Sequence, residues 1–333
     1  MNCALFDIIA LGELNVDLIL NQIDGFPEIG KEKFARNMTL TLGSSTAIFA
    51  ANAAALGSKV AFCGMIGNDS FGDLVETSLQ AKHVDTRYLI RTDKYATGAT
   101  ICMNYDEDRA NLTYQGAMDA MGLSDINPDV FKTTKHIHIS SVFMQSALKR
   151  DLMQILRLAK ENGVTTSLDT QWDPVEQWDL DYREVLPLIS VFMPNEKELC
   201  ALTRSKTVDE AIDKILPYIN AAVIKQGSRG SLLLTADGVR RRQEAMLNTR
   251  VVDAIGAGDS FNSGFISRFV QGKPLEDCQQ YGNMTGVVNT TAAGGTGAFT
   301  SREDVERVAK ERFGFVLVQK KLTQKSIKNE SVK

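Results

Sequence analysis

The segment 253–262 joins a glycine-rich turn to the start of an amphipathic helical pattern. Gly256, Ala257 and Gly258 are small enough for their backbone N–H groups to approach a ligand closely, and a helix N-terminus adds unpaired donors and the positive end of the helix dipole. We therefore predict an anion-binding turn. Asp259 follows it directly, where its carboxylate could accept the proton of a hydroxyl that attacks a phosphoryl group held by the turn. An ordinary glycine turn whose acidic residue stabilises the dipole is the alternative.

Two other nucleotide-binding motifs are excluded by the sequence. A P-loop needs Gly-Lys followed by serine or threonine, but the Gly-Lys pairs at Gly30 and Gly272 are followed by glutamate and proline. The dinucleotide fingerprint needs three glycines between a strand and a helix. The turn at 256–258 has only two, and the first predicted strand runs into residues 12–15 without that pattern.

The composition is that of a folded globular protein. Of the 333 residues, 44% are hydrophobic and 23% are charged, which is close to globular averages and unlike a disordered chain. The 37 basic and 41 acidic residues leave a formal net charge of −4, so we expect no general attraction for nucleic acid or anionic membranes. No apolar run reaches the roughly 18 residues of a membrane span, and the five cysteines contain no C-x-x-C pair. We expect a cytoplasmic protein.

Short apolar runs alternate with helical patterns along most of the chain, which predicts βαβ units, a parallel sheet covered on both faces and therefore an α/β fold. The predicted strands of this sheet are residues 7–11, 59–66, 135–139, 164–168, 191–193 and 221–225. Other segments are extended, polar and β-branched, and they predict a small second sheet that could act as a lid. Its strands are expected at residues 14–20, 32–42, 97–105 and 109–116, with a turn at 106–108 between the last two.

The C-terminal part carries two further helical patterns between residues 264 and 293, which are broken at 272–274 by Gly-Lys-Pro. Residues 315–333 contain five lysines and one glutamate, with few apolar anchors. This composition favours a basic, frayed tail over an arm that binds nucleic acid.

With its neighbours Phe-Asn included, the turn at 256–262 resembles the C-terminal signature of the ribokinase-like (PfkB) carbohydrate kinases. Residues 12–17, which read Gly-x-x-Asn-x-Asp, resemble the substrate-binding start of that family, and residues 43–73 resemble its N-terminal signature. Residues 194–198 and 227–230 are similar to its N-x-x-E motif and its nucleotide loop. Five motifs in the family's order are far more specific than any one of them.

The resemblance implies a three-layer ribokinase-like fold with a central, mostly parallel sheet and a small β-sheet lid. It implies one kinase domain over residues 1–314, with lid insertions at approximately 14–42 and 97–116. The implied activity is ATP-dependent transfer of the γ-phosphoryl group to a hydroxyl of a small sugar or polyol, with Mg²⁺ and, as in potassium-activated relatives, K⁺. A nucleoside or vitamin kinase of the same superfamily and a non-catalytic ligand-sensing relative are the alternatives. An exposed lid sheet could also pair with a second copy to form a homodimer.

The family's functional residues carry over to this sequence as follows. Asp259 would be the base, and Gly256, Ala257 and Gly258 would form the anion hole. The residues that would bind the substrate are Asn15, Asp17, Gly43, Ser44, Ile48 and Gln145. The residues that would bind the nucleotide are Asn195, Lys225, Gly227, Gly230 and Asn283. By the same resemblance, Glu198 would act on Mg²⁺ through water, and Asp253 and Ile255 would supply oxygens to a monovalent cation.

Three departures from the family pattern bear on the acceptor. Ile48 stands where an asparagine is expected to bind a sugar hydroxyl, and Gln145 stands where some sugar-kinase relatives carry a carboxylate. The segment 169–174 also lacks the family's arginine. Because an unpaired hydroxyl is costly in a closed pocket, we expect plain ribose and fructose to be poor acceptors. Trp172 could stack on a ring of the acceptor, but its residue type favours a buried core position.

Overall fold

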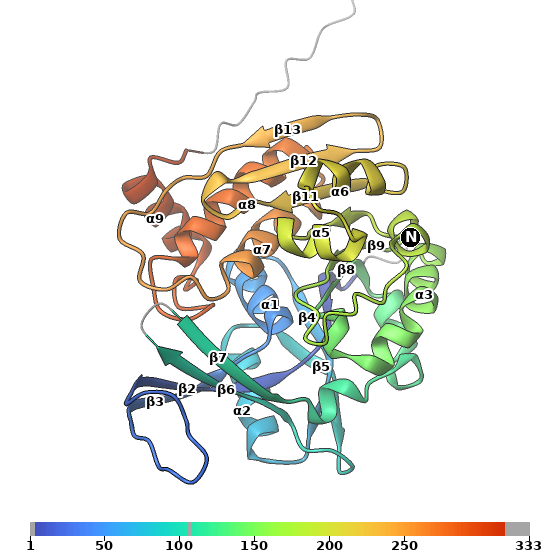
Figure 1. The fold of residues 1–333 in the computed structure, drawn as a ribbon. Helices are drawn as coiled ribbons and strands as arrows, with labels where there is room; N and C mark the ends of the chain where they lie inside the picture. The colour runs from blue at the N-terminus through green and yellow to red at the C-terminus, as the bar shows by residue number, and fades with distance from the viewer. Residues whose placement is uncertain (1–3, 106–107, 317–333) are drawn as a thin grey trace, which may run out of the picture.

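The computed structural model describes residues 4–105 and 108–316. Its centre is a nine-stranded sheet in the order β13-β12-β11-β10-β9-β8-β1-β4-β5 (Figure 1). The strands are β1 Phe6–Leu11, β4 Val60–Gly67, β5 Asp85–Thr92, β8 Thr134–Ser140, β9 Thr165–Asp169, β10 Val191–Phe192, β11 Ala221–Lys225, β12 Ser231–Thr235 and β13 Arg240–Gln243. Neighbouring strands pair in parallel, except that β12 is antiparallel to both β11 and β13. The predicted α/β fold is confirmed and its six predicted strands are present, whereas β5, β12 and β13 were not predicted.

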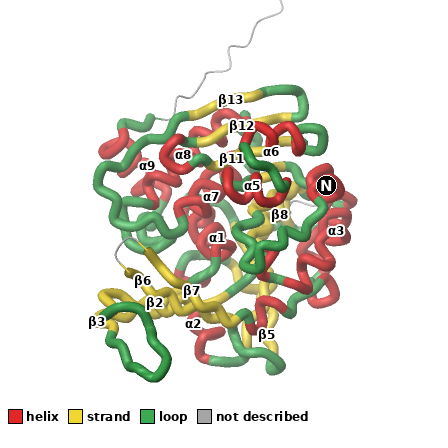
Figure 2. The backbone as a smooth tube through the Cα atoms, viewed as in Figure 1, coloured by secondary structure: helices red, strands yellow, loops and turns green. Residues whose placement is uncertain are grey.

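Helices cover both faces of this sheet (Figure 2), so its central strands are buried on both sides. One face is covered by α1 Ser45–Ala55, α2 Ser70–Ala81, α7 Ala257–Phe269 and α8 Leu275–Asn289. The other is covered by α3 Ser146–Glu161, α5 Glu196–Thr203 and α6 Val208–Ile215. The remaining helices are the short α4 Tyr182–Val185 and α9 Arg302–Phe313, which packs on α8.

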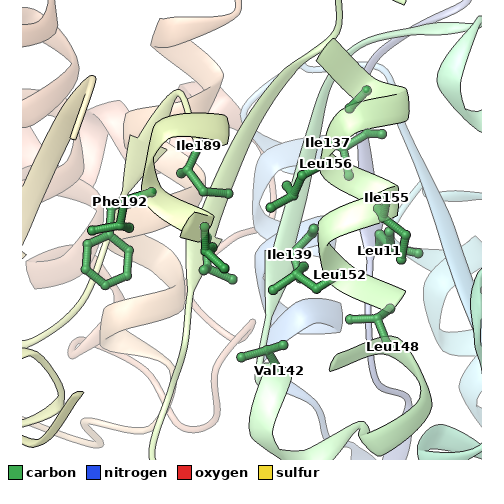
Figure 3. Packing of buried hydrophobic residues seen from close by; sticks show 14 of the residues in the cluster. Leu11, Ile137, Ile139, Val142, Leu148, Leu152, Ile155, Leu156, Ile189 and Phe192 are labelled. Atoms are coloured by element: carbon green, nitrogen blue, oxygen red, sulfur yellow. The ribbon is translucent and has the colours of Figure 1, made fainter. Parts of the chain in front are cut away.

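Side chains alternate between the two helical layers along each buried strand, as the period of a strand requires. On β8, Ile137 and Ile139 pack against α3, whereas His138 stacks on Phe49 of α1. The apolar residues of α3 recur every three or four positions and form one face. Figure 3 shows these α3 residues against the strands: Leu148, Leu152, Ile155 and Leu156.

A separate four-stranded sheet lies beside this main body in the order β3-β2-β6-β7 (Figure 1). Its strands are β2 Asn15–Ile23, β3 Ala35–Leu42, β6 Gly98–Tyr105 and β7 Asp108–Tyr114. The chain leaves the main sheet after β1 and returns through α1, and it leaves again after β5. The predicted second sheet is therefore present, and we call it the lid sheet. Of the predicted turn at 106–108, residues 106–107 lie outside the described residues.

The two helical patterns predicted after residue 264 correspond to α7 and α8, which meet at a turn containing Gly272 with φ +69°. The helices pack closely because small residues face each other. A Cβ on Gly264 would clash with Thr285, and one on Gly282 would lie 3.0 Å from the Phe261 carbonyl oxygen. Of the predicted tail, residues 317–333 lie outside the described residues. No helix in the described part of the chain is long and apolar enough to cross a membrane.

Candidate active site

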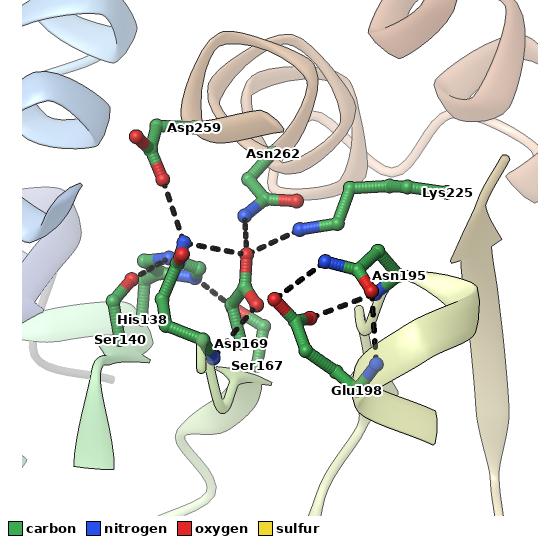
Figure 4. Close-up of polar contacts among 10 residues, drawn as sticks. His138, Ser140, Ser167, Asp169, Asn195, Glu198, Lys225, Asp259 and Asn262 are labelled. Atoms are coloured by element: carbon green, nitrogen blue, oxygen red, sulfur yellow. Dashed lines mark hydrogen bonds and ion pairs between the residues drawn. The ribbon is translucent and has the colours of Figure 1, made fainter. Parts of the chain in front are cut away.

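Residues from distant parts of the chain meet where the parallel strands end (Figure 4). Asp169 is the last residue of β9 and Lys225 the last residue of β11, while Asn195 follows β10. The first turn of α7 begins next to them, after Gly256, whose φ of +73° favours glycine. Ligands of open α/β sheets bind at this edge, so the turn predicted to bind an anion lies where the fold expects a ligand.

Asp259 lies in the first turn of α7 and is only 6% exposed. Its Oδ1 accepts a hydrogen bond from Gln171 Nε2 at 3.0 Å. Burial, followed by the nearby Asp169 carboxylate, raises the pKa of Asp259 to about 8, although the Lys225 ammonium acts in the opposite direction. The ionised form of a carboxyl group with this pKa is a stronger proton acceptor than an ordinary aspartate, and the ionised fraction grows as the pH rises toward 8.

Asp169 is a functional candidate that the sequence analysis did not identify. Its carboxylate is completely buried, and Oδ2 accepts hydrogen bonds from Asn262 Nδ2 at 2.6 Å and Gln171 Nε2 at 3.3 Å. The same oxygen forms an ion pair with Lys225 Nζ. The available signal was an acidic residue directly after a predicted strand, at the edge where the other motifs converge.

Lys225 was predicted to bind the nucleotide, and the structure gives its ammonium a protein partner instead of leaving it free. Burial alone would lower the pKa of Lys225, but the Asp169 and Glu198 carboxylates outweigh burial and raise it. The ammonium still lies beside the α7 turn, because a Cβ on Gly258 would be 3.6 Å from Nζ. Lys225 therefore brings a positive charge to the predicted anion hole.

Asn195 and Glu198 form a capping box at the start of α5. Asn195 donates through its backbone N to Glu198 Oε2 at 2.8 Å and through Nδ2 to Oε1 at 2.6 Å. The two side chains therefore bind each other directly. Glu198 is buried, and burial followed by the Asp169 charge raises its pKa to about 7. Within the described ranges, no three His, Cys, Asp or Glu side chains form a cluster that could hold a metal ion.

The predicted nucleotide loop is a tight 3₁₀ turn, Gly227–Arg229. Gly227 and Gly230 have φ of +58° and +93°, which favour glycine, and a Cβ on Gly230 would clash with the carbonyl oxygen of Gln243. Asn283 on α8 donates to Ser231 Oγ at 3.0 Å. The structure thus brings Asn283 next to the loop, although Asn283 and Ser231 are 52 residues apart in sequence.

On the lid side, Asn15 and Asp17 lie together at the start of β2. Asn15 Nδ2 donates to Asp17 Oδ1 at 2.8 Å and to Thr100 Oγ1 at 3.1 Å. Gly43 is required there, because a Cβ would clash with the Asp17 carboxylate. Burial raises the pKa of Asp17 to about 6, while the bond from Asn15 and the charge of Arg109 act against this rise.

Glu13 is a second buried carboxylate that the sequence analysis missed. It accepts hydrogen bonds from Ser44 Oγ at 3.2 Å and Ser141 Oγ at 3.0 Å, and others from the backbone and hydroxyl of Thr46. The Ser44 hydroxyl, predicted to bind the substrate, also donates to the Glu13 carbonyl oxygen at 2.7 Å. Glu13 thus connects the two ends of the β2–β3 insertion to the residue after β8.

Ile48 and Gln145, two of the three departures from the family pattern, have different surroundings. Ile48 lies against the turn before α7: a Cβ on Gly256 would be 3.1 Å from Ile48 Cγ2. Gln145 is fully buried, and its Nε2 donates to the carbonyl oxygens of Ser140 and Ser141 at 2.9 and 3.2 Å. Its amide donor is therefore already used by the backbone.

The proposed oxygens of the cation site also have protein partners. Asp253 Oδ1 accepts from the backbone N of Ile255 at 2.8 Å, and Oδ2 accepts from Gly294 N at 2.9 Å. The Ile255 carbonyl accepts from Asn289 Nδ2 at 2.7 Å. A cation here would have to share oxygens that the protein already satisfies.

Trp172 is 46% exposed, so the favoured prediction of a buried core position is wrong for this residue. The buried tryptophan is Trp178, whose ring lies edge-on to Trp172 and to Phe143 at centroid distances of 5.1 and 5.3 Å. Trp172 follows Gln171, whose side chain donates to Asp259, so the Trp172 backbone lies close to the buried aspartates.

Comparison with known proteins places this geometry in a family. The sequence matches the pfkB family carbohydrate kinases over residues 6–302. It is 26% identical over 298 residues to a 5-dehydro-2-deoxygluconokinase of Clostridium perfringens, covering 84% of this chain and 86% of that protein. It is 28% identical over 311 residues to an ATP-dependent ribose-1-phosphate kinase of Halopiger xanaduensis, covering 92% of this chain and 99% of that protein.

The fold is similar to that of Arabidopsis thaliana ribokinase complexed with ribose and ATP, with a TM-score of 0.80 and 23% identity, covering 92% of this chain and 99% of that chain. This likeness confirms the predicted ribokinase-like fold. Since the family match extends over almost the whole described chain, the protein belongs to the pfkB family of carbohydrate kinases.

Proposed function

We propose that this protein transfers the γ-phosphoryl group of ATP to a hydroxyl of a small sugar or sugar-like polyol, and that it does so in the cytoplasm. The observation that carries the proposal is a strongly basic, buried carboxylate, Asp259, directly after the glycine turn that begins α7. The relatives whose names state a sugar kinase activity support it. A non-catalytic sensor would need no such carboxylate beside an anion-binding turn.

In the proposed reaction the acceptor hydroxyl attacks the γ-phosphorus, and Asp259 takes its proton. The bond between the γ-phosphorus and the bridging oxygen breaks, and ADP leaves. The backbone N–H groups of Gly256, Gly258 and Asp259 would bind the negative charge that develops on the phosphoryl oxygens, and the Lys225 ammonium adds to this field. The Ala257 N–H, which was also predicted to take part, already donates to the Ala254 carbonyl oxygen at 3.2 Å. Asp169 holds Lys225 in place through the buried ion pair.

We propose that Mg²⁺ is held mainly by the phosphates and water, since the described residues offer no cluster of three ligands. The ion would neutralise charge on the phosphates. Glu198 fits a role through water, because it is buried next to Asp169, and burial followed by the Asp169 charge raises its pKa to about 7. Asn195 holds its carboxylate in one orientation.

The proposed K⁺ site has fewer available oxygens than a dedicated cation site would offer. Asp253 and Ile255 lie together near Gly294, but each already accepts hydrogen bonds from the protein. We propose K⁺ only as an activating ion that shares these oxygens. The turnover should rise when KCl replaces tetramethylammonium chloride at equal ionic strength, and equal rates in both salts would contradict this part of the proposal.

The acceptor is proposed to bind between the lid sheet and α7. Asn15 and Asp17 would bind its hydroxyls, and closure of the lid sheet would exclude water from the phosphoryl group. Ile48, which contacts the α7 turn, would face a part of the acceptor that carries no hydroxyl. An acceptor that is deoxygenated, methylated or ring-bearing at that position should therefore be preferred over ribose or fructose by about tenfold or more.

The outer face of the lid sheet supports the proposed homodimer. Leu18, Leu40, Ile101 and Leu112 lie opposite one another in register, on the face away from Asp17. Leu112 is 65% exposed, and an apolar row on a sheet face is a typical association surface. Sedimentation velocity should give a dimer that L112D converts to a monomer, whereas a wild-type monomer would contradict the proposal.

The activity is tested by measuring ADP release with ATP, Mg²⁺ and a panel of sugars, deoxy-sugars, sugar acids and nucleosides. One member of the panel should support turnover, and ³¹P NMR should detect a phosphate ester on it. The Ile48→Asn variant should shift kcat/KM toward unmodified sugars. A nucleoside as the best acceptor would favour the alternative of a nucleoside kinase, and no turnover with any acceptor class would favour a sensor.

A further inference from the structure

Gln171 is a polar residue at the active site to which the proposed reaction assigns no role. It lies in the loop after β9, two residues beyond Asp169, and has a φ of +55°. Residues other than glycine seldom adopt this left-handed conformation, and they do so mostly where the surroundings enforce it. The loop is held by Asp173, whose carboxylate accepts from Val175 N at 3.0 Å and Trp178 N at 2.6 Å. Gln171 is thus presented by a well-braced loop.

The Gln171 amide connects the two buried aspartates. Its Nε2 donates to Asp259 Oδ1 at 3.0 Å and to Asp169 Oδ2 at 3.3 Å. The amide orientation follows from the chemistry, because the opposite orientation would place the amide oxygen against two carboxylates that cannot donate when ionised. Asp169 is itself anchored by Asn262 and Lys225 (Figure 4). The amide therefore ties Asp259 to a fixed part of the main sheet.

The bond to Gln171 makes the two oxygens of Asp259 different. Oδ1 is occupied by the Gln171 amide, whereas Oδ2 accepts no hydrogen bond from any residue that the structure describes. We propose that Gln171 is a positioning residue for the base: it fixes Oδ1 and so leaves Oδ2 to take the proton of the acceptor hydroxyl. This inference rests on the proposed role of Asp259 as the base.

The charges around Asp259 explain why a neutral donor is useful there. Asp169, Glu13 and Glu198 raise its pKa and Lys225 lowers it. A second cation would bind the phosphates or neutralise the base, whereas an amide donor stabilises the carboxylate without adding charge. Removing that donor should raise the pKa of Asp259. Since the base must be ionised to act, the acid limb of the pH–rate profile should move to higher pH.

The test is the variant Gln171→Met, which keeps the length of the side chain and removes the donor. Gln177→Met, at an exposed position of the same loop, is the matched control. At neutral pH, Gln171→Met should lower kcat by about tenfold or more and move the acid limb of kcat/KM upward by about half a pH unit or more. The loss should become smaller at alkaline pH, and the KM for ATP should stay within about twofold. Gln177→Met should match the wild type.

The outcomes separate this inference from the proposal on which it rests. If Gln171→Met has the kcat and acid limb of Gln177→Met while Asp259→Asn is inactive, Gln171 does not position the base. If Asp259→Asn retains turnover, the assignment of the base is wrong and the inference is overturned with it. If Gln171→Met fails to fold in a thermal melt, Gln171→Asn decides the question, because asparagine tolerates the left-handed backbone and its shorter amide cannot hold the same bond. A Gln171→Asn variant with an unchanged pH profile would overturn the inference.

Discussion

The two carboxylates at the centre of the proposed reaction lie in contrasting surroundings. Asp259 is buried at the end of the main sheet beside Asp169 and Glu198, whereas Asp17 lies on the lid sheet and accepts a hydrogen bond from Asn15. Burial raises both pKa values, to about 8 for Asp259 and about 6 for Asp17. Near-complete burial, followed by the Asp169 carboxylate, makes Asp259 the stronger base. Asp17 is less deeply buried and lies beside Asn15 and Arg109, which oppose the rise, so it stays mostly ionised at neutral pH.

The largest loss of activity is expected when the proposed base, Asp259, is removed. Asp259→Asn should lower kcat by roughly 10²–10⁴, because the amide keeps the shape of the side chain but cannot accept the proton. The affinity for ATP should stay within about threefold, since the turn that would bind the phosphates is unchanged. Steady-state kinetics and nucleotide titration check both values. The control is Asp277→Asn, which changes an acid in the first turn of α8. Unchanged turnover by Asp259→Asn would refute the role of Asp259 as the base.

Removing the Asp17 carboxylate should weaken binding of the acceptor and leave the phosphoryl-transfer step largely unchanged. Asp17→Asn should raise the KM of the acceptor by about ten- to a hundredfold, because the charged acceptor of its hydroxyl bonds is lost. The KM for ATP should change little. The exposed Asp24→Asn on the same segment of the lid sheet is the control. A large fall in kcat with an unaltered acceptor KM would mean that Asp17 belongs to the catalytic step.

The raised pKa of Asp259 predicts that kcat/KM falls as the pH is lowered. The pKa of Asp259 is raised to about 8, so the base is increasingly protonated as the pH falls below that value. The kcat/KM should therefore fall by about tenfold per pH unit well below it and level off above it. The Asp17→Asn variant should keep this limb. A profile that is flat from about pH 6 to 9 would show that the free enzyme carries Asp259 as the ionised base throughout.

The smallest effect is expected at Glu198. The variant Glu198→Gln should raise the Mg²⁺ concentration for half-maximal rate by about three- to tenfold, since a charge near the metal's water shell is lost. Glu196→Gln, on the same first turn of α5 but paired with Arg229, is the control. Rates measured against free Mg²⁺ decide the outcome. If the midpoint is retained and only the plateau falls, Glu198 acts through the Asn195 cap and not on the metal.

Much of the fold follows from local patterns. Buried parallel strands such as β8 and β11 are short apolar runs, and α3 shows its apolar face in its spacing. The three strands that were not predicted are edge strands of the sheet or next to one. The edge strand β13 reads Arg-Arg-Arg-Gln, which carries no apolar alternation because both of its faces are largely exposed.

The residues of the proposed active site also fall into two groups, those that local sequence patterns identify and those that only the tertiary structure brings together. Gly256 and Asp259 could be identified from the sequence because a turn and a helix start are local features, and the capping box of Asn195 and Glu198 needs only three residues of spacing. The roles of Asp169 and Gln171 could not be identified, because their partners on α7 and β11 are distant in sequence. Strand order and register bring these groups together, and burial among them then sets the strength of each acid. Those are properties of the assembled sheet and of no single segment.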